Sequence, residues 1–389
     1  MRIQTHLVIT LALLFILALN TAARAQSYTE SVIYSFGGTS GNEPLFSGVV
    51  RDEAGNFYGT TYAGGTYNYG TVFKVDSSGN ETVLHNFGEG FDGRTPLAGL
   101  VRDASGHLFG TASEGGIRNS SCHKGCGIVF EVDESGNAKI LHSFTAGADG
   151  ANPFGGLIRD AAGNLYGTTQ MGGRYNYGTV FKIDHNGMES VLYAFGAPPD
   201  GEDPEAGVIR DAAGNLYGTT AGGGAFGSGS VFELDASGHE TVLYSFTGRS
   251  DGFAPAAPLL RTSNGDLFGT TFLGGAGIGT IFKVDVHGNE KTLHTFDGTT
   301  GAYPEGPLVS DSQGNLYGTT IQGGPGGIGG GVIFKITTLG IFSALYGFPG
   351  QPGGGNPNGP LLLDSSGTFY GTTSGGGNAN SGTVFKLTP

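Results

Sequence analysis

The sequence predicts an all-β protein: a seven-bladed β-propeller of four-stranded antiparallel blades, its ring closed by an N-terminal strand that joins the last blade. Three observations predict this fold. The motif Gly-x-(Leu/Phe)-(Tyr/Phe)-Gly-Thr occurs seven times. Segments with the composition of short strands surround every copy. The two ends of the chain hold complementary parts of one incomplete repeat.

The repeat accounts for the whole chain after its first 25 residues. Successive copies are offset by 49 to 57 residues. Residues 26–389 therefore divide into seven units of about 52 residues, which leaves no room for a second domain. The copies lie at 55–60, 106–111, 163–168, 214–219, 265–270, 314–319 and 367–372.

Each unit contains four short segments that are typical of strands, here called A to D in chain order. They are rich in β-branched and aromatic residues and are bounded by Gly, Pro, Asp or Asn. Strand C shows the period of two that a strand requires, since Phe73 and Val75 flank Lys74. Examples of strands A, B, C and D are residues 99–103, 56–61, 71–76 and 81–87.

The connections between strands form two classes. The A–B and C–D turns are tight, as in Asp-Glu-Ala-Gly-Asn at 52–56, where Asp caps the turn and Gly accepts a positive φ. The B–C and D–A connections are longer and differ between repeats. In an up-and-down blade these two long classes lie on the same side. We therefore expect one uniform face and one diverse face, with function on the diverse face.

The chain ends indicate how the ring closes. Residues 30–36 resemble a lone strand D, and the last repeat stops after a strand C at 383–389. We expect the first strand to complete the last blade, which an open solenoid would not need. The glycine of strand B, such as Gly167, also needs a reason, because glycine weakens a strand interior. We expect the Phe of the neighbouring strand C to pack over it.

The repeat resembles the GloVer repeat (Gloeobacter–Verrucomicrobium type), which occurs in exported bacterial tandem-repeat proteins. The resemblance covers all seven units and rests on Gly-Asn-Leu-Tyr-Gly-Thr-Thr, the Gly-Gly that follows, and Gly-Thr-Val-Phe-Lys. It implies a propeller-like fold and carries no assigned activity.

Charge and the N-terminal segment predict the compartment. The net charge of −14 repels phosphate backbones and anionic lipid, so nucleic acid is excluded as a partner. Residues 1–25 have the pattern of a signal peptide: Arg2, an apolar run at 7–19, and Ala23-Arg24-Ala25. An uncleaved anchor helix is the alternative, but the run is shorter than the ~20 residues that a bilayer needs. We expect a secreted monomer, extracellular or periplasmic, with no membrane insertion after cleavage.

Cys122 and Cys126 are the two cysteines, and His123 lies beside them. A disulfide is the simplest interpretation in an oxidising compartment. A metal site is the alternative, although two thiolates and one imidazole do not complete a tetrahedral set.

Two groups of residues on the diverse face are candidates for ligand binding. Four tyrosines on B–C loops offer the flat apolar face and polar rim that suit sugars: Tyr67, Tyr69, Tyr175 and Tyr177. The alternative is that these rings cover the core of their own blade. Four carboxylates on one D–A loop could hold Ca²⁺, against the alternative of solvated charge: Asp200, Glu202, Asp203 and Glu205. We expect no other cofactor.

These observations favour an exported propeller scaffold that binds a glycan or protein ligand through the face carrying the B–C and D–A loops. One alternative is a polysaccharide lyase or hydrolase with its site in the central funnel, where polar residues unique to one repeat would lie. Glu114, Glu205 and Glu305 are the candidates for such residues, but none has a partner that identifies it as catalytic. Another alternative is a structural envelope protein.

Overall fold

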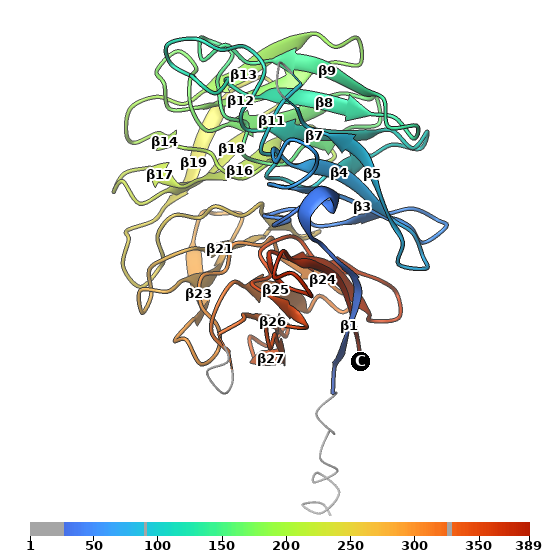
Figure 1. The fold of residues 1–389 in the computed structure, drawn as a ribbon. Coiled ribbons are helices and arrows are strands. Elements are labelled where there is room, and N and C mark those ends of the chain that lie inside the picture. Colours follow the sequence, from blue (N-terminus) through green and yellow to red (C-terminus); the bar gives the residue numbers. More distant parts are fainter. Residues whose placement is uncertain (1–26, 89–91, 325–328) are drawn as a thin grey trace, which may run out of the picture.

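The described residues of the computed structural model, 27–88, 92–324 and 329–389, form a seven-bladed β-propeller (Figure 1). Each blade is a four-stranded antiparallel sheet, so the predicted fold class is confirmed. The predicted signal segment 1–25 lies outside the described residues. In the described part of the chain, no helix has the length and apolar character needed to cross a membrane.

The first three blades follow chain order from strand A to strand D. Blade 1 comprises β2 (Val50–Arg51), β3 (Phe57–Thr61), β4 (Thr71–Val75) and β5 (Glu81–Asn86). Blade 2 comprises β6 (Val101–Arg102), β7 (Leu108–Ala112), β8 (Ile128–Val132) and β9 (Ala138–Ser143). Blade 3 comprises β10 (Ile158–Arg159), β11 (Leu165–Thr169), β12 (Thr179–Ile183) and β13 (Glu189–Ala194).

The next three blades repeat this order. Blade 4 comprises β15 (Ile209–Arg210), β16 (Leu216–Thr220), β18 (Ser230–Leu234) and β19 (Glu240–Ser245). Blade 5 comprises β20 (Leu260–Arg261), β21 (Leu267–Thr271), β22 (Thr280–Val284) and β23 (Glu290–Thr295). Blade 6 comprises β24 (Val309–Ser310), β25 (Leu316–Thr320), β26 (Val332–Ile336) and β27 (Phe342–Gly347).

Blade 7 joins the two ends of the chain, as predicted. It contains β29 (Leu362–Leu363), β30 (Phe369–Thr373), β32 (Thr383–Thr388) and, as its outer strand, β1 (Thr29–Ser35). The register of β1 on β32 runs from Thr29 opposite Thr388 to Ser35 opposite Thr383. Glu30 adds side-chain bonds, since its carboxylate accepts the Tyr346 hydroxyl at 2.9 Å and the Gly354 amide at 2.9 Å. The short helix η1 (Gly38–Ser40) then leads into blade 1.

Small pairings confirm that the D–A and B–C connections lie on one face. In blade 4, β14 (Gly201–Glu202) pairs with β17 (Gly222–Gly223), and in blade 7, β28 (Gly354–Gly355) pairs with β31 (Gly375–Gly376). The other five blades have a single bridge at the same place: Asn42 with Ala63, Arg94 with Glu114, Ala151 with Met171, Phe253 with Leu273, and Ala302 with Gln322.

Phenylalanines hold adjacent blades together. The Phe of each strand C is buried against the Phe that directly follows strand D of the preceding blade, with ring centroids 4.9 to 5.5 Å apart. Phe36, which follows β1, supplies this ring to Phe73 of blade 1. Aromatic pairs of this kind add to the free energy already gained by burying their area. The N-terminal segment therefore contributes both a strand and a core side chain to ring closure.

The strand-B glycine packs as predicted. In every blade this glycine lies opposite the Phe of strand C, as Gly167 lies opposite Phe181. A Cβ atom added to Gly167 would lie 2.7 Å from Cζ of Phe181 and 2.9 Å from Cδ2 of Leu157. Both atoms belong to buried side chains, so a larger residue has no space to enter.

Candidate functional site

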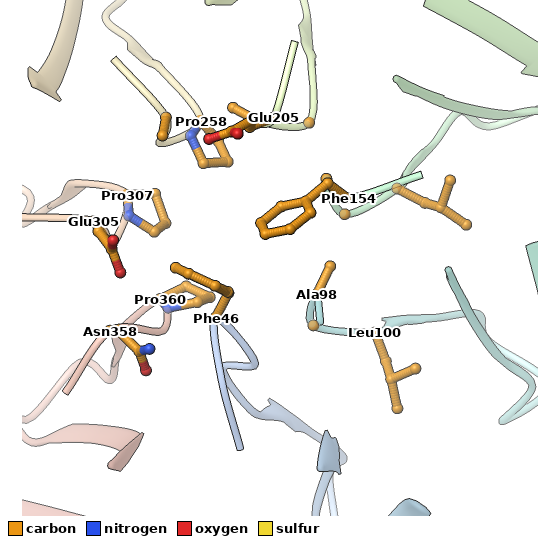
Figure 2. A pocket seen from close by; sticks show the side chains of 17 residues that line it. Phe46, Ala98, Leu100, Phe154, Glu205, Pro258, Glu305, Pro307, Asn358 and Pro360 are labelled. Atoms are coloured by element: carbon orange, nitrogen blue, oxygen red, sulfur yellow. The ribbon is translucent and has the colours of Figure 1, made fainter. Parts of the chain in front are cut away.

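A cavity of about 340 Å³ lies where the segments that precede the seven A strands meet (Figure 2). We call these segments the collar: residues 46–49, 97–100, 154–157, 205–208, 256–259, 305–308 and 358–361. Each blade contributes to the lining, in blade order through Phe46, Ala98, Phe154, Glu205, Ala256, Glu305 and Asn358. Since the A strands are preceded by the D–A connections, the cavity opens on the diverse face.

A left-handed residue before a proline turns each D–A connection into the collar. In all seven described blades this residue has a φ between 52° and 59°, a region that residues other than glycine rarely adopt. Hydrogen bonds hold it from both sides. In blade 4, the Asp203 amide donates to the Tyr177 carbonyl at 3.2 Å, and the Asp203 carbonyl accepts the Ala221 amide at 2.9 Å. The seven residues are Glu43, Thr95, Asn152, Asp203, Ala254, Tyr303 and Asn356.

Small residues in the collar let neighbouring backbones approach closely. A Cβ atom added to Gly155 would lie 2.6 Å from the carbonyl carbon of Ala206, and one added to Gly207 would overlap the Gly156 carbonyl oxygen. Glycine is therefore required where these two segments pass each other. The position directly after the proline varies from blade to blade, and in blades 3 to 7 it supplies a lining residue: Phe154, Glu205, Ala256, Glu305 and Asn358.

The cavity has an apolar part and a polar part. The rings of Phe46 and Phe154 meet with their centroids 5.6 Å apart. Glu305 and Asn358 lie on the side away from Phe154, and Glu205 lies beside Pro258 (Figure 2). A ligand in this space would contact aromatic faces and carboxyl oxygens together.

The two carboxyl groups are held in an environment that disfavours their charge. Burial, together with a smaller contribution from the negative charge of Glu205, raises the pKa of Glu305 to about 7. Burial also raises the pKa of Glu205, with a contribution from Asp203, although a hydrogen bond of 2.8 Å from Gln170 opposes the rise. Near neutral pH, Glu305 can therefore act as a hydrogen-bond donor or as an acceptor.

Several polar atoms near Glu305 have no partner among the described residues. Asn358 is 4% exposed and lines the cavity, yet its Oδ1 accepts no hydrogen bond. The buried hydroxyls of Thr270 and Thr319 are also unpartnered. An unsatisfied buried polar group costs about 1–3 kcal/mol, and of these three residues only Asn358 lines the cavity, where a ligand could supply the missing donor.

These threonines break a pattern that links the other blades. In the other five blades, the hydroxyl of the equivalent strand-B threonine donates a hydrogen bond to a collar carbonyl of the next blade. These bonds are Thr60 to Ala98 (2.9 Å), Thr111 to Gly155 (3.1 Å), Thr168 to Ala206 (2.8 Å), Thr219 to Ala257 (3.3 Å) and Thr372 to Ser47. Thr270 belongs to blade 5, and Thr319 belongs to blade 6, which carries Glu305. The collar is therefore least satisfied around Glu305.

The four tyrosines of the predicted site fall into two groups in the structure, two exposed and two packed against the core. Tyr67 and Tyr175 are 53% and 51% exposed, in blades 1 and 3. Tyr69 and Tyr177 are half-buried and pack against the cores between blades. The Arg94 guanidinium lies 3.8 Å from the centre of the Tyr69 ring. The alternative interpretation, that these rings cover the core, thus applies to Tyr69 and Tyr177.

The predicted calcium ligands do not form a cluster. Asp200 caps its turn by accepting the Tyr193 hydroxyl at 2.8 Å and the Gly196 amide at 2.6 Å, and Glu202 accepts the Gly223 amide at 3.1 Å. The turn at Asp203 then directs Glu205 into the collar cavity. Over the described ranges, no group of three or more His, Cys, Asp or Glu side chains could hold a metal ion.

The remaining predicted residues have mixed outcomes. Cys122 and Cys126 form the predicted disulfide. Of the three funnel candidates, Glu205 and Glu305 line the cavity, whereas Glu114 lies outside it and pairs with Lys124 at 3.1 Å. Sequence reasoning missed Phe46, Phe154 and Asn358. For Phe154 and Asn358 the signal available was the variable residue directly after a proline that recurs in each repeat, whereas in blade 1 Leu45 separates Phe46 from Pro44.

Comparisons with known proteins agree with this architecture. The family model described as the Gloeobacter/Verrucomicrobia repeat matches residues 15–213 and 203–389. No curated protein matches the chain.

Among solved structures, the chain is similar to the extracellular domain of a putative hybrid two-component system from B. thetaiotaomicron, with a TM-score of 0.58, 15% identity and coverage of 93% of this chain and 41% of that chain. It is also similar to the extracellular domain of a putative one-component system from the same organism, with a TM-score of 0.58, 12% identity and coverage of 94% and 42%. The chain thus spans about two fifths of the length of both structures. At these identities the likeness shows the fold alone.

Proposed function

Since the chain belongs to the Gloeobacter/Verrucomicrobia repeat family and its repeats surround one cavity, we propose that it is an exported binding propeller whose collar cavity holds a sugar. The observation that carries this proposal is the composition of the cavity. Phe46 and Phe154 offer apolar faces for the C–H face of a sugar ring. Glu205, Glu305 and Asn358 offer acceptors for its hydroxyl groups.

The size of the cavity fits this role. Its volume of about 340 Å³ is at the lower end of the range of about 300–1,000 Å³ that is usual for small-ligand sites. A single small ligand, or the end of a longer chain, would fill it. The loops of the diverse face would then contact the rest of a longer glycan.

Export is part of the proposal. It is supported by the signal-peptide pattern of residues 1–25 and by the shared fold with two domains described as extracellular.

A second candidate function is glycan cleavage, and one observation favours it. Two carboxyl groups whose pKa values are both raised, that of Glu305 to about 7, are suited to share the roles of general acid and general base. In that case protonated Glu305 would donate to the leaving oxygen and Glu205 would act as the base. Cleavage would require the same sugar contacts as binding.

We expect Phe154→Ala to weaken glycan binding about tenfold or more, because the variant removes one aromatic face of the cavity. The measurement is a glycan array followed by titration calorimetry of the leading glycan, using the chain without residues 1–25. Tyr67→Ala is the matched control, since it removes an exposed ring outside the cavity.

Loss of binding in Tyr67→Ala, with full binding in Phe154→Ala, would move the site to the loops and refute the proposal. An assay of reducing ends on the same samples tests the second function. New reducing ends that disappear in Glu305→Gln would support cleavage.

A further inference from the structure

Building on the proposed function, we propose that the collar cavity selects a positively charged sugar, one that carries a free amino group. The cavity lining contains Glu205 and Glu305 but no Lys, Arg or His. No basic side chain of the lining therefore neutralises the negative charge of these carboxyl groups when they are ionised. The cation that completes the site would be supplied by the ligand.

Some carboxylates elsewhere on the chain are paired with basic side chains. Glu114, which the sequence offers as a comparable candidate, lies 3.1 Å from Lys124 and 3.8 Å from Arg94. Glu205 and Glu305 take part in none of the ion pairs found among the described residues. Asp203, the further charge that acts on Glu205, is also acidic. The field in the cavity thus has one sign, and a cation entering it would be attracted.

Asn358 provides a second and independent observation. Its exposed fraction is only 4%, it lines the cavity, and its Oδ1 is without a hydrogen-bond donor in the described chain. An ammonium group has three N–H donors and no acceptor. It would satisfy acceptors of this kind, whereas a hydroxyl group has only one hydrogen to donate. The amide oxygen and the carboxyl oxygens together match an ammonium group better than they match a hydroxyl.

The aromatic half of the cavity does not oppose a cation. Phe46 and Phe154 present their rings to the same space, and a ring face attracts a positive charge as well as a C–H surface. An amino sugar would therefore keep the stacking contact of a neutral sugar and add a charge-assisted hydrogen bond.

Affinity for an amino sugar should rise with pH. The groups that titrate in or beside the cavity are Glu205, Glu305 and Asp203, and burial raises the pKa of each above its ordinary value. Since Glu305 titrates near pH 7, it is mostly neutral at pH 5 and about half ionised at pH 7. A bound ammonium group favours the ionised form, so its binding strengthens over this interval, while a neutral sugar has no such dependence on charge.

The test is titration calorimetry of the folded chain with glucosamine and with glucose, which differ in one amino group. At pH 7 we expect glucosamine to bind at least about tenfold more tightly, and this ratio should fall at least about fivefold at pH 5. In the double variant Glu205→Gln/Glu305→Gln, which keeps the shapes of both side chains, the ratio should approach one. Glu114→Gln is the matched control, because it removes a carboxylate outside the cavity and should keep the preference.

Each other outcome has a defined meaning. Equal affinity for the two sugars, or a preference that survives in Glu205→Gln/Glu305→Gln, would overturn the inference and leave the proposed sugar site standing. Binding of calcium chloride alone, with no preference between the sugars, would also overturn it in favour of a metal site. Absence of binding to any sugar, on the array as well, would refute the proposed function itself.

Discussion

We expect deletion of residues 27–36 to abolish the cooperative unfolding transition of the ring. The deletion removes β1, which pairs with β32 along its length, and leaves β32 as an exposed edge. It also removes Phe36, so the buried ring of Phe73 loses its partner from the neighbouring blade. The loss is about 5 kcal/mol or more, which is comparable with the whole stability of a typical domain. Calorimetry and near-ultraviolet circular dichroism report the result.

A circular permutant provides the control for this deletion. It starts at residue 38 and carries residues 27–37 after Pro389, joined by a short turn of the Asp-Ser-Ser-Gly kind used between strands C and D. Because β1 already lies antiparallel to β32, the permutant keeps the pairing that completes blade 7. We expect its midpoint to lie within about 5 °C of the parent. A truncated chain that melts like the parent would show that the ring does not depend on β1.

Replacing one strand-B glycine should also have a large effect. We expect Gly167→Val to destabilise the protein by about 3 kcal/mol through overpacking. Valine favours strands by up to about 1 kcal/mol, but the clash with Phe181 and Leu157 is larger and decides the sign. Chemical denaturation measures the difference.

A second substitution identifies the cause. Phe181→Leu shortens the side chain that meets the added Cβ, so the double variant Gly167→Val/Phe181→Leu should be at least about 1 kcal/mol more stable than the sum of the two single effects. Additive losses, or an unchanged denaturation midpoint for Gly167→Val, would contradict the packing account.

The fold could be predicted because each repeat encodes it again. The strand-B glycine, the strand-C Phe and the tight turns recur in every unit, so seven copies of the pattern predict the same blade. Ring closure could be predicted for a related reason: residues 30–36 have the pattern of the strand that the last repeat lacks.

The site was harder to predict because its residues are far apart in the sequence. Phe46, Phe154 and Asn358 come together only when the ring closes, because each is contributed by a different blade. Glu205 and Glu305 were found as polar residues that break the repeat, and both follow a proline directly. Local clustering was misleading, since Asp200 and Glu202 serve backbone groups of their own blade and only Glu205 reaches the cavity.

The tyrosine loops show the same limit. The two rings of each loop are separated by a single residue, yet Tyr67 is exposed and Tyr69 packs against the core between blades 1 and 2. Residue type alone could not separate a ring that faces solvent from one that covers a core.

One measurement tests most directly whether the collar cavity is the binding site. The chain contains no Trp, so Phe154→Trp places a single fluorescent reporter in the cavity, and Phe226→Trp places one on a B–C loop where the native side chain is 64% exposed. On titration with a glycan that the parent binds, the account predicts a saturable change in the fluorescence of the reporter at position 154 and none at position 226. A saturable change at position 226 with a silent reporter at position 154 would contradict it.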